Sequence, residues 1–198
     1  RGLDAGARGL VIAAFALIQD RAWYSHGGPA VRPPLDRIDA SYELRLPRLP
    51  ADPTWRRAVD RAGRIFGVQV TELKTAANVG KLAAGVREEA RKLQAATRQL
   101  VTVLEYRRDM LGLAEDAGRL ATAKDGASLV ATLVAEDDAT AFAEALANAP
   151  AGVNEVAFGR ALKSADDVLR ALEEMDWGVL EAISVITDDP EAPAILER

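Results

Sequence analysis

The chain has 198 residues, of which 49% are hydrophobic and 28% are charged, and its formal net charge is −5. A chain of this length and composition can bury a core as one large or two small domains without disulfide or metal staples. It contains no cysteine and a single histidine, His26, which excludes a disulfide framework, thiolate zinc sites and histidine-rich metal sites, and fits a reducing, cytoplasmic setting.

The charge is divided unequally along the chain. Residues 1–120 contain 20 Lys and Arg against 14 Asp and Glu, whereas residues 121–198 contain 5 against 16. Two interpretations fit this asymmetry: a basic half that faces nucleic acid, or two halves that pack together through complementary charge. The second is favoured because surface charge asymmetry commonly occurs without a polyanion.

Residues 1–53 are predicted to form an apolar helix followed by an extended connection. Residues 9–18 are a run of ten apolar residues, too short to span a bilayer and without a signal-peptide cleavage pattern, so a buried helix that continues to about Trp23 is expected. Six prolines and two glycines break helix repeatedly over residues 26–53. A short strand at residues 42–46 fits the sequence, but no partner strand is recognisable.

Residues 54–112 are predicted to form a helical bundle. Thr54 is the expected N-cap of a first helix, and Gly67 its terminator. The next helix is long, about residues 72–111. Its apolar residues recur every seven positions, at Val79, Val86, Leu93 and Leu100. The hydrophobic stripe around them is wider than the seam of a two-stranded coiled coil and suits the middle of a bundle.

Residues 113–198 are predicted to be an acidic subdomain of short helices. Apolar periodicity places these helices at about residues 127–135, 139–147, 155–162, 166–175 and 177–186. Acidic pairs stand at Asp137/Asp138, Asp166/Asp167 and Asp188/Asp189, none with the spacing of a calcium loop. We interpret two of these pairs as helix starts, and Ser164 with Asp167 as a capping box. The predicted fold class is all-α, a bundle around one long helix with a C-terminal subdomain of short helices.

No catalytic motif is recognisable. The sequence has no phosphate-binding loop, no dinucleotide-binding glycine motif and no nucleophile elbow. His26 stands alone in a glycine-rich turn and is interpreted as a half-exposed loop residue rather than a proton-transfer group. We therefore predict no catalytic residue, no cofactor and no metal ion for this chain.

Arginines are the one group of residues that the sequence suggests as a binding site. They are Arg57, Arg61 and Arg64 on one face of the predicted helix, with Arg45 and Arg48 upstream. Arginines on one helix face can bind phosphates with strong salt dependence. However, Asp60 lies among them and no aromatic platform interleaves them. Carboxylates of this chain or of a partner are the predicted ligands, with nucleic acid as the alternative.

Several stretches of the chain resemble one large bacterial protein family. They are ALIQDRAWYSHGGP at residues 16–29, YELRLPRLP at 42–50, RIFGV at 64–68 and ALKSADDVLRALEEMDWGVLEAI at 161–183. These stretches are similar to a middle region of the large P-loop ATPase, or phage resistance protein, of type 2 bacteriophage-exclusion (phage growth limitation) systems. The resemblance covers nearly the whole chain but includes no catalytic signature.

The resemblance implies a long protein with an N-terminal ATPase module and extended helical regions, acting beside a methyltransferase, a phosphatase-like protein and a kinase to block phage replication. Because the first residue is Arg and not Met, a piece of such a protein is expected. No position matches the nucleotide-binding motif, so the expected function is a non-catalytic, cytoplasmic scaffold. It would dock other phage-defence proteins or other parts of its own chain, or relay the state of the ATPase to them. No membrane partner is expected. The alternative is a DNA-binding helical module that uses the Arg57, Arg61 and Arg64 face.

Overall fold

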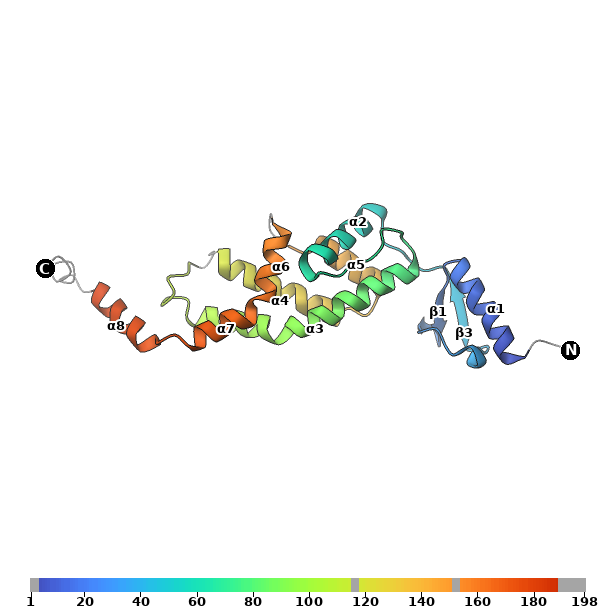
Figure 1. Cartoon of the computed structure of the whole chain (residues 1–198), viewed down its shortest axis with the longest axis horizontal. Coiled ribbons are helices and arrows are strands. Elements are labelled where there is room, and N and C mark those ends of the chain that lie inside the picture. Colours follow the sequence, from blue (N-terminus) through green and yellow to red (C-terminus); the bar gives the residue numbers. More distant parts are fainter. Residues whose placement is uncertain (1–3, 115–117, 151–153, 189–198) are drawn as a thin grey trace. The chain divides into compact units, whose positions relative to one another are not determined.

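The computed structural model describes residues 4–114, 118–150 and 154–188, which are predominantly helical (Figure 1). The helices are α1 (Ala5–Ile18), α2 (Asp52–Arg61), α3 (Ala76–Tyr106), α4 (Gly118–Ala135), α5 (Ala139–Asn148), α6 (Glu155–Lys163), α7 (Ala165–Glu173) and α8 (Trp177–Asp188), with the short turns η1 (Leu35–Arg37) and η2 (Ala62–Phe66). The strands are β1 (Ala22–Ser25), β2 (Gly28–Pro29) and β3 (Tyr42–Arg45). The predicted helical class is confirmed. The structure also contains a small sheet that was not predicted.

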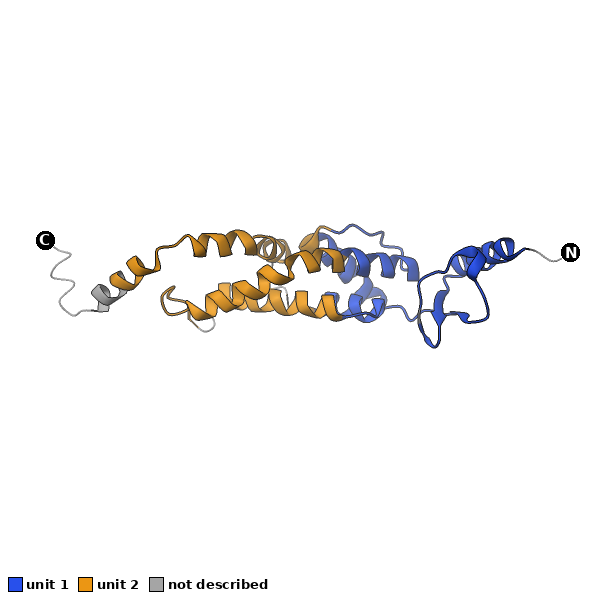
Figure 2. Cartoon of the chain, turned by 90° about the horizontal axis from the view of Figure 1, so that it is seen from below, with its two compact units in different colours: residues 1–63, 68–85, 136–148 blue, residues 64–67, 86–135, 149–198 orange. Residues whose placement is uncertain are grey.

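The described residues group into two compact units (Figure 2). Unit 1 consists of Arg1–Gly63, Val68–Gly85 and Glu136–Asn148, and unit 2 of Arg64–Gly67, Val86–Ala135 and Ala149–Arg198. Each unit is thus assembled from segments that are distant in the sequence, whereas the predicted segments 1–53, 54–112 and 113–198 are consecutive. As independent domains, those three segments stay a prediction.

A three-stranded antiparallel sheet of order β2-β1-β3 lies in unit 1. The expected strand at residues 42–46 therefore has a partner: β1 pairs with β3, with Trp23 opposite Leu44. The prediction that the first helix continues to Trp23 is wrong, because α1 ends at Ile18 and the chain turns back into β1. His26 (φ 51°) and Gly27 (φ 82°) form the two-residue loop between β1 and β2, and tight hairpin turns require such positive φ angles.

The core of unit 1 forms where α2 packs against α5. Its fully buried side chains include Trp55 of α2 and Phe142 and Leu146 of α5, and the Trp55 indole Nε1 donates to the Glu72 carbonyl at 2.7 Å. Helix α2 begins at Asp52, with Ala51 as its N-cap, and not at Thr54 as predicted. A proline in the first turn of α2 is favourable there, since the missing N–H would have no partner in any case.

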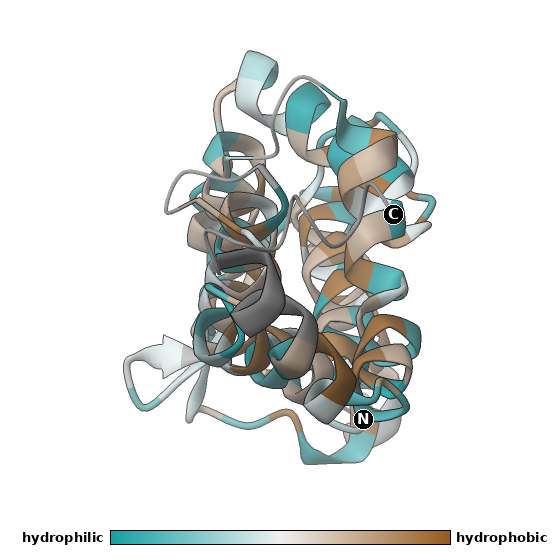
Figure 3. Cartoon of the chain, turned by 90° about the vertical axis from the view of Figure 1, so that its left-hand side faces the viewer, coloured by the Kyte–Doolittle hydropathy of each residue, from teal (hydrophilic) through white to brown (hydrophobic). Residues whose placement is uncertain are grey.

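Unit 2 has a separate hydrophobic cluster. Its buried members are Leu100, Leu104, Leu120, Ala165, Leu169 and Leu172. Hydrophobic and hydrophilic residues are interspersed along the helices of the chain, as the hydropathy colours of Figure 3 show. Helix α3, predicted at 72–111, is one unbroken helix of 31 residues. Its first ten residues belong to unit 1 and the rest to unit 2.

Candidate interaction surfaces

One residue of the predicted arginine site, Arg61, joins two helices of unit 1 by hydrogen bonds. The Arg61 guanidinium Nη1 donates to the carbonyl oxygens of Leu146 at 3.1 Å and Ala147 at 2.9 Å. These carbonyls belong to the last turn of α5, where the helix itself supplies no donor. Arg61 therefore joins α2 to the C-terminal end of α5 and satisfies two otherwise unpaired acceptors.

The other four arginines lie in different surroundings. Arg45 forms an ion pair with Glu43 at 2.6 Å, and its guanidinium lies over the Tyr24 ring at 4.8 Å from the centroid. Arg48 is exposed, while its backbone carbonyl accepts from the Thr140 hydroxyl. Arg57 and Arg64 are exposed, on α2 of unit 1 and in η2 of unit 2 respectively. As a binding site, the five arginines stay a prediction.

Helix α1 shows an unusual distribution of side chains. Its buried residues are small, namely Gly9, Ala13 and Ala16. Its large apolar residues are exposed to solvent, by 58% for Leu10, 59% for Val11, 51% for Phe15, and 76% each for Leu17 and Ile18. The prediction of a buried helix at residues 9–18 is therefore wrong for the chain as the structure describes it.

The small face of α1 lies against η1. A Cβ atom at Gly9 would collide with the backbone carbonyl of Leu35, so the two segments approach as closely as a glycine permits. This contact occupies only one side of the helix. Val11, Phe15 and Ile18, at i, i+4 and i+7 spacing, form the stripe on the opposite side. We call Leu10, Val11, Phe15, Leu17 and Ile18 the α1 apolar surface.

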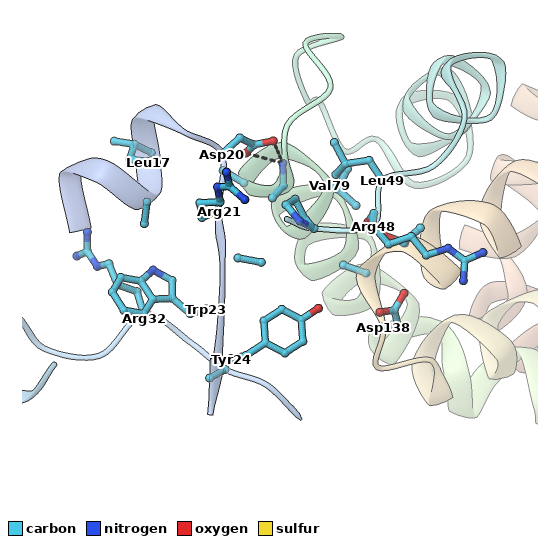
Figure 4. A pocket seen from close by; sticks show the side chains of 18 of the residues that line it. Leu17, Asp20, Arg21, Trp23, Tyr24, Arg32, Arg48, Leu49, Val79 and Asp138 are labelled. Atoms are coloured by element: carbon cyan, nitrogen blue, oxygen red, sulfur yellow. Dashed lines mark hydrogen bonds between the residues drawn. The ribbon is translucent and has the colours of Figure 1, made fainter. Parts of the chain in front are cut away.

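An open cavity of about 390 Å³ lies in unit 1 near the end of α1 (Figure 4). The Asp20 carboxylate accepts the backbone N–H of Ala76 at one side of it. The Arg21 Nε is buried and has no hydrogen-bond acceptor among the described residues. Arginines and aspartates are mixed in the lining, with Arg21, Arg32 and Arg48 beside Asp20, Asp137 and Asp138. The balanced charge does not select an anion or a cation.

Unit 2 holds a larger open cavity, of about 1160 Å³. Most of its lining is apolar, and Leu104, Phe158, Leu162 and Val168 contribute from three different helices, α3, α6 and α7. The charged residues in the lining are Arg119 and Asp125. A predominantly apolar lining of this kind suits apolar groups better than charged ones.

One of the acidic pairs, Asp137/Asp138, stands at the start of α5. Within residues 4–114, 118–150 and 154–188, no group of three or more His, Asp or Glu could hold a metal ion. Asp138 Oδ1 accepts the Ala141 N–H at 2.7 Å, as expected for a helix start. The predicted capping box is wrong, because the Ser164 side chain makes no cap bond to α7 and donates to the Ala161 carbonyl instead. Asp189 lies outside the described residues.

Ionisable groups with shifted pKa values lie in local surface contacts. The hydroxyl and backbone N–H of Ser41 lower the pKa of Asp39. A hydrogen bond from Lys74 lowers the pKa of Asp52, and a hydrogen bond to Glu89 raises that of Lys92. These shifts come from neighbouring side chains on the surface and not from a cleft that prepares a group for catalysis.

The comparison with known families decides which protein this segment comes from. The family described as BREX System ATPase PglY protein 6th domain matches residues 59–198, most of the chain. The chain belongs to this family. The resemblance to the ATPase of a bacteriophage-exclusion system is thus confirmed, and the chain is a segment of an anti-phage defence ATPase of the PglY family.

The PglY family match covers the helical part of the chain and begins inside α2. Helix α1, the sheet and η1 all precede it. No solved structure matches the chain. In the described part of this PglY-family segment, no helix is long and apolar enough to cross a membrane.

Proposed function

We propose that this chain is a non-catalytic helical scaffold of a BREX ATPase, which docks other defence proteins or other domains of the same ATPase. The α1 apolar surface is the observation that supports this function. Helix α1 carries a single charged residue, Arg8, among its 14 residues, and five of its large apolar side chains are exposed to solvent.

Exposure of this kind has an energetic consequence. Burial of one Val, Leu, Ile or Phe side chain is worth about 1.5–3 kcal/mol. Soluble proteins rarely leave several such side chains together in water unless they form a binding surface. A helix that is hydrophobic all round is normally buried on all sides. The α1 apolar surface is therefore a docking surface in the assembled ATPase, and other proteins of the defence system are the second class of occupant.

The test is a triple variant, Val11→Ser/Phe15→Ser/Ile18→Ser, in the complete ATPase. We expect loss of assembly with its partners or neighbouring domains and a loss of phage protection, with ATP hydrolysis by the isolated protein retained. The matched control is Leu73→Ser, which removes an isolated apolar side chain that is 69% exposed. Unchanged assembly and protection in the triple variant would reject the scaffold function through α1.

The alternative function is DNA binding through Arg57, Arg61 and Arg64. The exposed side chains of Arg57 and Arg64 support it. Arg61 supports it less, because its guanidinium already donates hydrogen bonds to two carbonyls of α5. Titration with short duplex DNA at about 50 and 200 mM salt separates the two functions, because phosphate contacts weaken steeply with salt. Binding that is salt-sensitive and lost in Arg57→Glu would favour DNA; no binding at the lower salt would leave the scaffold.

A further inference from the structure

We infer that the cavity of unit 1 near the end of α1 binds a small molecule that carries a carboxylate or phosphate group on an apolar body. This inference goes beyond the docking function and does not depend on it, because it rests on Arg21 and on the first turns of α3 and α5.

Arg21 presents a hydrogen-bond donor to which the described part of the chain offers no acceptor. Its Nε is buried and has no hydrogen-bond partner among the described residues. The side chain lines the cavity and extends from the start of β1 towards the first turn of α3 (Figure 4). A buried donor without an acceptor is unfavourable, and a guanidinium forms its strongest hydrogen bonds with carboxylates and phosphates. Arg21 therefore favours an oxyanion in the cavity.

The neighbouring carboxylate does not serve Arg21 as its acceptor. Asp20 precedes Arg21 in the chain and lines the same cavity. Both of its carboxylate oxygens accept the backbone N–H of Ala76, at 2.9 and 3.1 Å. Asp138, from the other side of the cavity, accepts the Ala141 N–H in the same way at the start of α5. These two aspartates are engaged as helix caps, which leaves the Arg21 Nε without a partner from either of them.

The starts of two helices shift the charge balance of the lining towards positive. Formal charges cancel, because three arginines and three aspartates line the cavity. Its lining also includes residues of the first turns of α3 and α5, namely Ala76, Ala77, Ala139 and Thr140. Each helix N-terminus is equivalent to about half a positive elementary charge, and N–H groups at such ends bind anions. The cavity as a whole therefore favours an anion, at the place where Arg21 lacks an acceptor.

The size and the walls of the cavity suit a small molecule with an apolar part. Its volume of about 390 Å³ falls within the range of about 300–1,000 Å³ that is usual for small-molecule sites. Apolar side chains from four separate segments of unit 1 contribute to the walls, namely Leu17, Trp23, Leu49 and Val79. An inorganic ion would leave these walls in contact with water, whereas an anionic group on an apolar body would cover them.

The first experiment titrates the 198-residue chain with phenyl phosphate and with benzoate, and follows the arginine Nε–H signals by NMR. Benzyl alcohol, which has a similar apolar body and no charge, is the control probe, and all samples have the same ionic strength. We expect a saturable shift of the Arg21 Nε–H signal with at least one anionic probe and none with benzyl alcohol. The probe that binds more tightly distinguishes a phosphate ligand from a carboxylate ligand.

The second experiment removes the donor. Arg21→Met should weaken binding of the anionic probe at least about tenfold, as followed by the backbone amide signals of Ala77 and Ala139. Because the substitution also removes a buried donor without an acceptor, the melting temperature of the chain without probe should not fall by more than about 2 °C. Arg37→Met, at an exposed arginine outside the lining, is the matched control and should bind the probe as the parent chain does.

Three results would overturn the inference. They are no saturable shift of the Arg21 signal with either anionic probe, equal shifts with the anionic probes and benzyl alcohol, and equal affinities of the parent chain and Arg21→Met. The first would mean that water serves the Arg21 Nε, and the second that the cavity selects apolar groups without regard to charge. The titration of the parent chain decides the matter even if Arg21→Met does not fold. None of these results bears on docking through α1, which the Val11, Phe15 and Ile18 variant tests separately.

Discussion

The carboxylate of Asp20 caps a helix that begins 56 residues later in the chain. Its Oδ1 and Oδ2 accept the backbone N–H of Ala76, at 2.9 and 3.1 Å. The first N–H groups of α3 have no partner inside the helix, so this long-range contact satisfies one of them. Asp20 adopts φ 46°, in the left-handed region that Asp and Asn tolerate better than most residues. Within unit 1, Asp20 thus links the end of α1 to the start of α3.

Asp20→Ala should destabilise unit 1, since it removes the acceptor and places alanine at a positive φ. Loss of an N-cap costs about 0.5–2 kcal/mol, and urea unfolding measures it as a lower midpoint. Asp20→Asn keeps an oxygen acceptor and tolerates the φ angle, so its effect should be less than half as large. Equal losses for the two variants would show that the hydrogen bond to Ala76 contributes nothing.

Arg61→Met should destabilise the contact between α2 and α5. It leaves the carbonyls of Leu146 and Ala147 without the donor that they have in the structure, and hydrogen bonds to a charged group are worth about 1.5–3 kcal/mol. Arg57→Met, one turn earlier and exposed, is the matched control and should change the free energy of unfolding by less than about 0.5 kcal/mol. If both variants unfold at the same denaturant concentration, Arg61 is not a structural residue.

The positions of several helices could be predicted from the local periodicity of apolar residues. The seven-residue recurrence of apolar side chains predicts a helix over residues 72–111, and α3 spans Ala76–Tyr106. Helices α5 and α6 end within one residue of the predicted ends. Such patterns are readable because the residues that share a helix face are close in the sequence.

Pairings between distant segments could not be predicted in the same way. The four residues of β1 have no alternation that separates them from a helix end, and their partner strand begins at Tyr42. The acceptors of the Arg61 guanidinium are 85 and 86 residues away, so the sequence shows a basic face where the structure uses one arginine internally. The nearly all-apolar composition of α1 indicates burial, but not which side of the helix is covered within this chain.

Gly9→Ala should detach α1 from η1. A Cβ atom at this position would collide with the Leu35 carbonyl, which is backbone and cannot move aside. Gly6→Ala is the matched control on the same helix, because its Cβ would meet only the Asp4 Oδ1 at 3.4 Å. Both substitutions raise helix propensity by about 1 kcal/mol, so Gly6→Ala should stabilise the chain and Gly9→Ala should destabilise it. Amide hydrogen exchange over α1 distinguishes these outcomes, and protection that rises in both variants would contradict the close packing.

The surface contact of Asp52 with Lys74 should make a small part of the stability depend on pH. A hydrogen bond from Lys74 and its charge lower the pKa of Asp52 below the usual value. A carboxyl group whose pKa is lower in the folded state contributes stability above its unfolded pKa and loses it as the pH falls through the folded pKa. The contribution should therefore be lost progressively as the pH falls below about 4. Lys74→Met should return the Asp52 pKa towards its usual value in an NMR titration and remove this part of the acid sensitivity. Lys81→Met, at an exposed lysine of α3, should leave the Asp52 pKa unchanged; an equal change in both variants would mean that the net charge of the surface, and not the Lys74 contact, sets this pKa.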